Sequence, residues 1–350
     1  MWRRVSLSLG VLILLLSGCV ISPRRDASSG GGGGGGGTPT GKLYVTVDSG
    51  NAIVRFDSAF TANGNIAPAA TVSGPDTQLA SPQFIALDQQ ADRLFVAGNN
   101  ASAVLIFDAV STKTGNSAPN RRIAGSATSL TNPTDLSFDK GRELLYVVQG
   151  TTVLVFSSTS STNGNVAPAR TITPNPAFNI GGIFVDAANN RLFLSDPADP
   201  TLGADAIRVF DRADTLTGNV APSRTITGSA TQLGQPGGLI VDSAGRLIVS
   251  NFSPARITIY SNAAAASGNV IPAGAITISD MNGPNQITLN AANGDLYVAD
   301  SVGAKVLVFA NVATLNGNVS ATRNINGSNT QLGTGGLIGG PRGVALDPTR

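Results

Sequence analysis

The chain has 350 residues, with 42 glycines, 23 Lys and Arg against 21 Asp and Glu, one cysteine and no histidine. Without histidine, mechanisms that use an imidazole base or imidazole metal ligands are excluded, including Ser-His-Asp and Cys-His catalysis and most zinc sites. With only 5% aromatic residues, the chain has few side chains for stacking on bases, so we expect no nucleic acid partner. An apolar fraction of 41% suffices for a sizeable core in one large domain or two ordinary ones.

The first residues have the pattern of an export signal. Arg3 and Arg4 precede an apolar run over residues 5–16, which is too short for a transmembrane helix of about 20 residues. Small residues follow this run, as they do before a cleavage site. The sequence therefore predicts a signal peptide over residues 1–18.

The segment Leu16-Ser17-Gly18-Cys19 resembles the bacterial lipobox. This resemblance implies that the chain is cut before Cys19 and that the cysteine thiol is diacylated, which makes the protein a lipoprotein. Two or three acyl chains hold a protein stably on a membrane without spanning it. Val20 stands where inner-membrane retention signals have aspartate, so within the cell envelope we expect the outer membrane rather than the inner one.

The expected cleavage removes two basic residues, which leaves 21 basic and 21 acidic side chains. The mature protein is then neutral and has no net charge with which to attract nucleic acid or anionic lipid. Residues 19–41 contain the acylated cysteine and a segment rich in Pro, Ser and Gly, with an unbroken glycine run over 30–37. Such a segment is a flexible tether, with a mean reach of roughly 25 Å for about twenty residues.

From residue 42 to residue 350 the chain repeats itself. The clearest marker is a Gly-Asn pair, which recurs at intervals of 51, 49, 54, 50 and 49 residues. Six units of about fifty residues thus account for everything after the tether. The pairs are Gly64-Asn65, Gly115-Asn116, Gly164-Asn165, Gly218-Asn219, Gly268-Asn269 and Gly317-Asn318.

Within a unit, short runs of Val, Ile, Leu, Phe and Tyr have a period of two and are bounded by Gly, Asn, Asp and Pro. The second unit predicts four strands, over residues 84–87, 93–96, 104–107 and 121–123. Four-stranded antiparallel sheets repeated around an axis are the blades of a β-propeller. We therefore expect an all-β, six-bladed β-propeller with almost no helix.

The ends of the chain predict how the ring closes. The repeats begin at a second strand, residues 43–47, and end just after a first strand, residues 343–346. If the last strand pairs with the first blade, the blade is complete and no open sheet edge remains. This pairing favours a closed disc over an open array.

The repeat resembles the NHL-type propeller blade, whose order is proline, a strand ending in Asp, a turn, a strand ending in Asp or Asn, and a strand ending in an aromatic residue. Pro284 through Asp300 to Phe309, and Pro236 through Asn251 to Tyr260, follow this order. The resemblance covers residues 42–350. Because such blades occur in protein-binding, RNA-binding and enzymatic propellers, the fold alone leaves the function open.

Three repeated features are better explained by structure than by chemistry. The Gly-Asn pairs favour turns between third and fourth strands, and arginines on outermost strands discourage pairing between sheet edges. Acidic or amide residues that end the first strands are expected to cap the following turns. These arginines are Arg122, Arg170, Arg224 and Arg323, and the capping residues are Asp88, Asp139, Asp186, Asp242, Asn290 and Asp347.

Candidate binding residues lie at the expected mouth of the central channel, on the face where the innermost strands begin. Asp135, Gln286 and Arg342 depart from the repeat there, whereas a purely structural role would be filled alike in every blade. A water-filled channel with soluble lining is the alternative. The full candidate set is Gln83, Asp135, Asn251, Asn285, Gln286, Asp300 and Arg342.

The longest unit owes its length to an enlarged loop over residues 196–205. Its carboxylates Asp196, Asp199 and Asp205 could hold Ca²⁺, a hard cation that prefers six to eight oxygen ligands. The spacing matches no known calcium loop, and a solvated loop stiffened by proline is the alternative. Calcium is the only cofactor that the sequence suggests.

Two function classes remain. In the first, a monomeric propeller displayed from the membrane binds a protein, peptide or glycan. In the second, a resemblance to gluconolactonase-type six-bladed propellers implies a metal-dependent lactonase or esterase, in which Asp135 with Asn285, Gln286 or Asp300 would hold the metal. The only glutamate, Glu143, is expected on the opposite face. The absence of an assembled reactive group favours the binding module.

Overall fold

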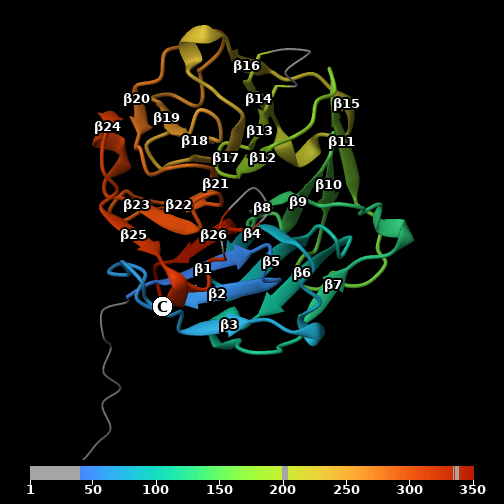
Figure 1. The fold of residues 1–350 in the computed structure, drawn as a ribbon. Coiled ribbons are helices and arrows are strands. Elements are labelled where there is room, and N and C mark those ends of the chain that lie inside the picture. The colour runs from blue at the N-terminus through green and yellow to red at the C-terminus, as the bar shows by residue number, and fades with distance from the viewer. Residues whose placement is uncertain (1–39, 199–203, 334, 336–338) are drawn as a thin grey trace, which may run out of the picture. The chain divides into compact units, whose positions relative to one another are not determined.

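The structure is a computed structural model that describes residues 40–198, 204–333, 335 and 339–350. The expected signal peptide, Cys19 and nearly all of the tether lie outside the described residues. Six sheets surround a common centre and form a six-bladed β-propeller (Figure 1), as the repeats predict. In the described part of the chain, the helical segments are short 3-10 turns, and none is long and apolar enough to cross a membrane.

Each blade has four main strands that follow one another from the centre outward. The first blade is β26 (Pro341–Asp347), β1 (Lys42–Val47), β2 (Ala52–Phe56) and β3 (Ala70–Val72). The second is β4 (Pro82–Asp88), β5 (Arg93–Gly98), β6 (Ala103–Asp108) and β7 (Arg121–Ile123). The third is β8 (Asp135–Asp139), β9 (Leu144–Gln149), β10 (Thr152–Phe156) and β11 (Arg170–Pro174), with β15 (Gly218–Val220) added at its rim.

The other three blades follow the same order. The fourth is β12 (Gly182–Asp186), β13 (Arg191–Asp196), β14 (Ala206–Asp211) and β16 (Arg224–Thr227). The fifth is β17 (Pro236–Val241), β18 (Leu247–Asn251), β19 (Arg256–Tyr260) and β20 (Gly274–Thr277), with β24 (Gly317–Asn318) at its rim. The sixth is β21 (Pro284–Asn290), β22 (Asp295–Asp300), β23 (Lys305–Phe309) and β25 (Arg323–Asn326). The 3-10 turns are η1 (Pro75–Thr77), η2 (Val110–Thr112), η3 (Ser126–Thr128), η4 (Ala213–Thr215), η5 (Ser229–Thr231), η6 (Val312–Thr314) and η7 (Ser328–Thr330).

The last strand closes the ring. β26 pairs antiparallel with β1, with Lys42 opposite Asp347 and Leu43 opposite Leu346. The innermost strand of the first blade therefore comes from the opposite end of the chain from its three other strands, which confirms the predicted closure. Beyond β26, the Arg350 guanidinium donates to the carbonyl of Gln89 at 2.6 Å and so ties the chain end to the second blade.

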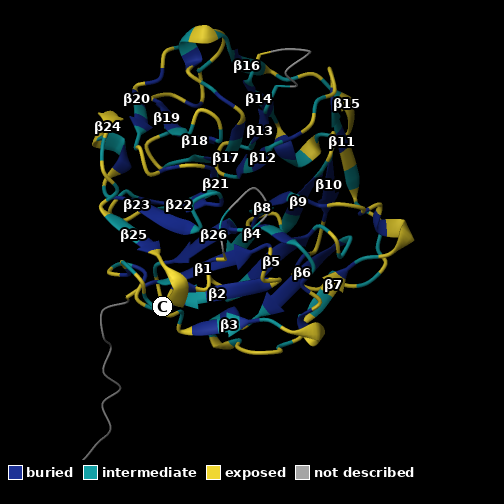
Figure 2. Cartoon of the chain, in the orientation of Figure 1, coloured by how far each residue is buried: buried dark blue, intermediate teal, exposed yellow. Residues whose placement is uncertain are grey.

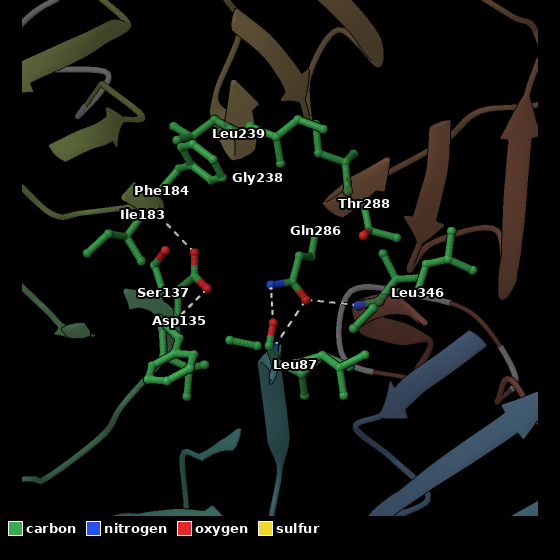
Figure 3. A pocket seen from close by; sticks show the side chains of 18 of the residues that line it. Leu87, Asp135, Ser137, Ile183, Phe184, Gly238, Leu239, Gln286, Thr288 and Leu346 are labelled. Carbon is green, nitrogen blue, oxygen red and sulfur yellow. Dashed lines mark hydrogen bonds between the residues drawn. The ribbon is translucent and has the colours of Figure 1, made fainter. Parts of the chain in front are cut away.

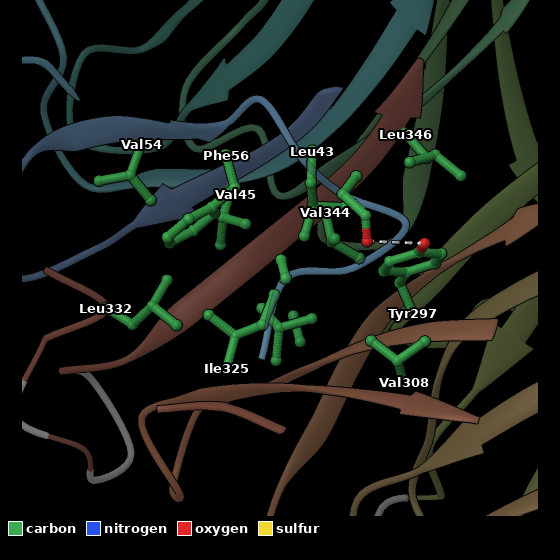
Figure 4. Close-up of a cluster of buried hydrophobic side chains, with 14 of the residues drawn as sticks. Leu43, Val45, Val54, Phe56, Tyr297, Val308, Ile325, Leu332, Val344 and Leu346 are labelled. Carbon is green, nitrogen blue, oxygen red and sulfur yellow. Dashed lines mark hydrogen bonds between the residues drawn. The ribbon is translucent and has the colours of Figure 1, made fainter. Parts of the chain in front are cut away.

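The core lies between neighbouring blades. Figure 4 shows one cluster, in which Val54 and Phe56 of the first blade pack with Tyr297, Val308 and Ile325 of the sixth. Middle strands are buried on both faces, whereas exposed residues gather in the loops (Figure 2). This double burial explains why many strands are continuous apolar runs rather than alternations of apolar and polar residues.

The residues that end the first strands cap turns, as predicted. The Asp88 carboxylate accepts the amide of Ala91 at 3.2 Å, and the Asp347 carboxylate accepts the amide of Thr349 at 2.9 Å. Equivalent bonds to amides two or three residues further on are made by Asp139, Asp186, Asp242 and Asn290. These polar side chains therefore have a structural role in every blade.

The Gly-Asn pairs do more than turn the chain, because each glycine joins the outermost strand of the preceding blade. The Gly115 amide donates to Thr71 in the first blade at 2.7 Å, and the Gly64 amide donates to Asn324 in the sixth at 2.8 Å. The other four glycines pair in parallel with β7, β11, β16 and β20. The sequence marker of the repeat is thus a connection between blades, which local turn preferences do not predict.

Two of the arginines expected as edge charges also connect blades. Arg323 of the sixth blade donates to the carbonyl of Ala59 in the first at 2.6 Å, and Arg170 of the third donates to the carbonyl of Asp214 in the fourth. Each guanidinium satisfies a partly buried loop carbonyl of the next blade. The arginines at these positions are therefore structural, but through pairing with the next blade.

In four places the asparagine of the pair accepts a backbone amide in the loop that leaves the preceding blade. Asn165, for example, accepts the amide of Ala127 at 2.7 Å. This contact requires glycine at position 125, where φ is 122° and ψ is 172° and an added Cβ would lie 2.5 Å from the Asn165 side-chain oxygen. Such backbone angles are accessible essentially only to glycine.

We predict that Gly125→Ala destabilises the fold by about 3 kcal/mol, at the upper end of the usual range for a strained backbone position. The matched control is Gly150→Ala, where φ is 55° and nothing lies within 4 Å of the added Cβ. This control should cost only about 1 kcal/mol. Urea unfolding of both variants measures the difference, and equal costs would show that the contact between Asn165 and Gly125 does not constrain the blade junction.

Candidate functional site

A cavity of about 190 Å³ lies in the central channel, and all six innermost strands contribute to its lining. Figure 3 shows that apolar side chains form much of its wall, among them Leu87, Phe184, Leu239 and Leu346. Its polar lining side chains are Gln89, Asp135, Ser137, Gln286 and Thr288. Of the seven candidate residues from the sequence, Asp135 and Gln286 line this cavity.

Asp135 begins β8 and is only 2% exposed. One of its carboxylate oxygens accepts the amide of Leu136 at 2.6 Å, and the other accepts the amide of Ile183, in the fourth blade, at 2.8 Å. The carboxylate thus joins two adjacent blades at the wall of the channel. A carboxylate has about four acceptor positions, so these two bonds leave acceptor capacity that can face the cavity.

Gln286 crosses the channel from the sixth blade. Its side-chain oxygen accepts the amides of Ile85 at 3.1 Å and of Val344 at 2.9 Å, and its side-chain nitrogen donates to the carbonyl of Ile85 at 2.8 Å. Val344 belongs to the neighbouring first blade, and Ile85 to the second. One amide side chain therefore connects three blades (Figure 3).

These contacts have a common physical cause. An innermost strand has a sheet partner on one side only, so the amides and carbonyls on its axial side need other partners. Asp135 and Gln286 supply them, and the Ser137 hydroxyl does the same by accepting the amide of Val185 at 3.0 Å. Asp135 and Gln286 differ from the residues at the same positions of the other repeats. These two side chains make hydrogen bonds that stabilise the channel wall.

Burial raises the pKa of Asp135 well above its usual range, and the two backbone amides that donate to the carboxylate offset this effect only in part. Asp135 is the only ionisable side chain among the described residues that line the cavity. An ionised carboxylate in this place carries no countercharge from the cavity wall. A strongly shifted group in a cavity is also a candidate for a functional role.

Asn251 and Asp300 do not line the cavity. Asn251 is fully buried, accepts the amide of Gly234 at 2.9 Å and donates to the Thr258 hydroxyl at 3.1 Å. Asp300, also fully buried, accepts the amides of Gly283 at 2.8 Å and Gly303 at 3.1 Å. Both side chains hold the loop that precedes the innermost strand of their blade, and Asp300 also holds the turn between β22 and β23.

The other three candidates are also engaged with nearby loops. Gln83 donates to the Ser81 hydroxyl at 2.9 Å, and Asn285 donates to the Ser301 hydroxyl at 2.6 Å. Arg342 lies 3.4 Å from the carboxylate of Asp48. The structure therefore places these three residues near the start of the innermost strands but outside the lining of the cavity.

The metal ligands suggested by the gluconolactonase resemblance are not brought to one point. Asp135 and Gln286 share the cavity, where each side chain accepts two backbone amides and the single side-chain oxygen of Gln286 accepts both of its own. Asn285 and Asp300 are engaged in loops outside it. Within the described ranges, no three His, Cys, Asp or Glu residues are grouped so that they could hold a metal ion.

The enlarged loop does lie between second and third strands, β13 and β14. Its first carboxylate, Asp196, binds Arg208, with the Arg208 Nη2 atom 2.6 Å from an Asp196 oxygen. The Asp205 carboxylate accepts the amides of Ala198 at 3.1 Å and Gln235 at 3.0 Å. Asp199 lies outside the described residues, and calcium binding by this loop stays a prediction.

The same loop borders a groove of about 880 Å³ between the third and fourth blades. The opposite wall is the loop after β11, which sequence reasoning missed. Four blades continue from the outermost strand into a 3-10 turn, whereas this loop has the sequence Pro176-Ala177-Phe178-Asn179 instead. The sequence itself shows that this loop lacks the glycine that precedes the 3-10 turn in a regular loop. The remaining described lining residues are Thr151, Asp196, Pro197, Ala198, Ala204, Ala206, Arg208, Thr225 and Thr227.

Arg208 is the only cationic side chain among the groove's described lining residues. Its guanidinium carbon lies 4.7 Å from the centre of the Phe178 ring, and its nitrogens bind Asp196 at 2.6 and 2.8 Å. Burial raises the pKa of Asp196, and the bonds from Arg208 lower it by less. Arg208 is therefore held between an aromatic ring and a carboxylate at the wall of the groove.

Comparisons with known proteins bear on the fold only. No model of a known protein family matches the chain, and no curated protein matches it. Among solved structures, a chain in the crystal structure of a nidogen/laminin complex is similar, with a TM-score of 0.57 and 11% sequence identity. The match covers 88% of this chain and 98% of that chain. At this identity, the similarity supports the propeller fold.

The pH dependence of stability tests the environment of Asp135. Because the folded protein holds the Asp135 proton more tightly than the unfolded chain does, this residue lowers stability as pH rises from about 4 towards its folded-state pKa. We predict that Asp135→Asn gains stability relative to wild type as pH rises from about 4 towards 7. The gain is about 1.4 kcal/mol for each unit by which the pH rises, until the pH reaches the folded-state pKa. Chemical unfolding of both proteins measures this difference, in which the contributions of the shared carboxylates cancel. A difference that is constant with pH would contradict it.

Proposed function

We propose that the protein is a lipoprotein of the bacterial cell envelope whose β-propeller binds a protein, peptide or glycan. The anchor is the diacylated Cys19, and the outer membrane is the favoured location. The tether over residues 19–41 would leave the propeller free to meet partners near the lipid surface. The single observation that carries the binding role is the groove between the third and fourth blades.

Two departures from the repeat meet in this groove. The loop after β11 replaces a 3-10 turn, and the loop between β13 and β14 belongs to the longest unit. In repeat proteins, insertions on one face commonly mark the binding surface. The fifth blade also lacks the 3-10 turn after its outermost strand, but only at the third and fourth blades does such a loop face an enlarged loop across a groove.

The chemistry of the groove suits an extended peptide segment or a protein loop. Alanine, proline and Phe178 provide apolar surface, and the guanidinium of Arg208 is placed for a carboxylate or a carbonyl. Binding pockets in proteins combine such an apolar lining with a few oriented polar groups. The similar chain of the nidogen/laminin structure was solved in a protein complex, which is compatible with this role but does not assign it.

We predict that Cys19→Ser abolishes acylation and releases the protein from the membrane fraction, because the mature chain then has no lipid anchor. Mass spectrometry of the N-terminal peptide and fractionation of cells measure the two effects. An unprocessed Cys19, or a Cys19→Ser variant that stays in the membrane fraction after cleavage, would contradict the anchor.

We predict that a photo-crosslinking amino acid at Ala177 captures a defined partner in intact envelopes, since Ala177 is exposed and lines the groove. The matched control is Ala127, an exposed alanine in the regular loop that leaves the second blade. Arg208→Ala should reduce capture from Ala177 by at least tenfold, measured by mass spectrometry of the crosslinked product. Equal capture from both alanines, or no effect of Arg208→Ala, would contradict a recognition role for the groove.

A further inference from the structure

The channel cavity holds a buried acid that the proposed function does not use. Asp135 lies at its wall, and the nearest groups that offset its charge are the two backbone amides of Leu136 and Ile183. Among the described residues that line the cavity there is no lysine or arginine. A buried ionised carboxylate without a cation is unfavourable, so an incoming cation would gain a countercharge that the protein does not supply.

The size and the apolar lining of the cavity indicate what the uncharged part of such a ligand would be. The innermost strands contribute Phe138, Phe184, Ile240 and Leu346 to the apolar part of the cavity wall. A cavity of about 150 Å³ with an apolar lining is known to accommodate benzene, and this one has about 190 Å³. The space therefore suits a ligand with roughly seven or eight non-hydrogen atoms.

One end of the channel is occupied at the level of Gln286, whose amide connects the sixth, first and second blades. From that level the lining continues to Leu87 and Gln89 beside the end of β4. Access from the face where the innermost strands end would bring a ligand past the apolar side chains to Asp135. The polar head would enter first, and the apolar body would stay against the wall.

We propose that the central channel binds a small organic cation, a primary ammonium on an apolar body of about benzyl size, with Asp135 as its counter-ion. The ammonium donates to the free acceptor positions of the Asp135 carboxylate while the carboxylate keeps its bonds to Leu136 and Ile183. The body contacts the apolar wall. The same chemistry is found in a free amine and in a lysine side chain of a partner protein, and the test distinguishes the two.

A divalent metal ion fits this cavity less well. Ca²⁺ prefers six to eight oxygen ligands, but Asp135 is the only carboxylate that the structure describes in the lining, and the side-chain oxygen of Gln286 already accepts the amides of Ile85 and Val344. The apolar wall would also leave a hydrated ion without partners over most of its surface. An organic cation satisfies both the acid and the wall.

The experiment is calorimetric titration of the full chain with benzylammonium, with benzyl alcohol as the uncharged ligand of matched size. We expect benzylammonium to bind at least tenfold more tightly than benzyl alcohol. Asp135→Asn should remove this preference, and binding of benzylammonium to wild type should strengthen as pH rises through the titration of Asp135. Equal binding of the two ligands, no binding of benzylammonium, or an unchanged preference in Asp135→Asn would overturn the proposal.

Two further arms keep the result interpretable. Ile240→Trp fills the cavity without changing its charge and should abolish binding even if Asp135→Asn fails to fold; binding that survives this variant would overturn the assignment to the channel. Titration with Nα-acetyl-lysine methylamide distinguishes the sources: tighter binding than benzylammonium favours a lysine side chain, and weaker binding favours a free amine. Arg208→Ala, which lies in the groove, should leave amine binding unchanged, so failure of the amine site and failure of the groove are separable.

Discussion

The antiparallel pairing of β26 with β1 is the constraint on which the rest of the structure depends. Every blade buries its faces against its two neighbours, so an open array would expose two apolar faces and one incomplete sheet. The first blade has its innermost strand only because residues 341–347 return to it. Once this pairing forms, all six innermost strands can surround one channel, and a side chain such as Gln286 can connect blades that are distant in sequence.

Closure creates a second requirement at the centre of the ring. Six strand edges meet there, and each has amides and carbonyls without sheet partners. Asp135, Ser137 and Gln286 accept such amides at particular blades rather than in all six. A residue that breaks the repeat can therefore serve the structure, because the geometry at the axis differs from blade to blade. Irregularity alone does not separate a binding residue from a stabilising one.

This distinction explains what could be predicted from the sequence. Strand order, blade number and closure follow from local patterns that recur six times, and the caps made by Asp88 and its equivalents are local as well. Whether Asp300 faces the channel or its own loop depends instead on the direction of the loop backbone, which no local pattern contains. The role of the Gly-Asn pairs was hidden for a similar reason, because Gly115 and Asn116 bind the first blade rather than their own. The loop after β11 has neither the glycine nor the 3-10 turn. There, Asn219 pairs through its backbone, as part of β15, with β11. Asn318 pairs in the same way with β20 in the fifth blade, so a blade without the glycine and the 3-10 turn is a sequence signal for an irregular surface.

The two candidate sites differ in how they relate to stability. The groove combines strand residues of the fourth blade, such as Arg208, with exposed loop residues such as Ala177, and these loop residues can change to suit a partner at little cost to the fold. The channel is built from the strands that hold the ring together, and Asp135 there both joins two blades and lacks a countercharge. An ionised carboxyl at this position disfavours the empty channel and favours an occupied one. The physical conflict at Asp135 is therefore the reason to look for a ligand there, since a purely structural link between the third and fourth blades could be made by an uncharged amide, as Gln286 does between the sixth and the first.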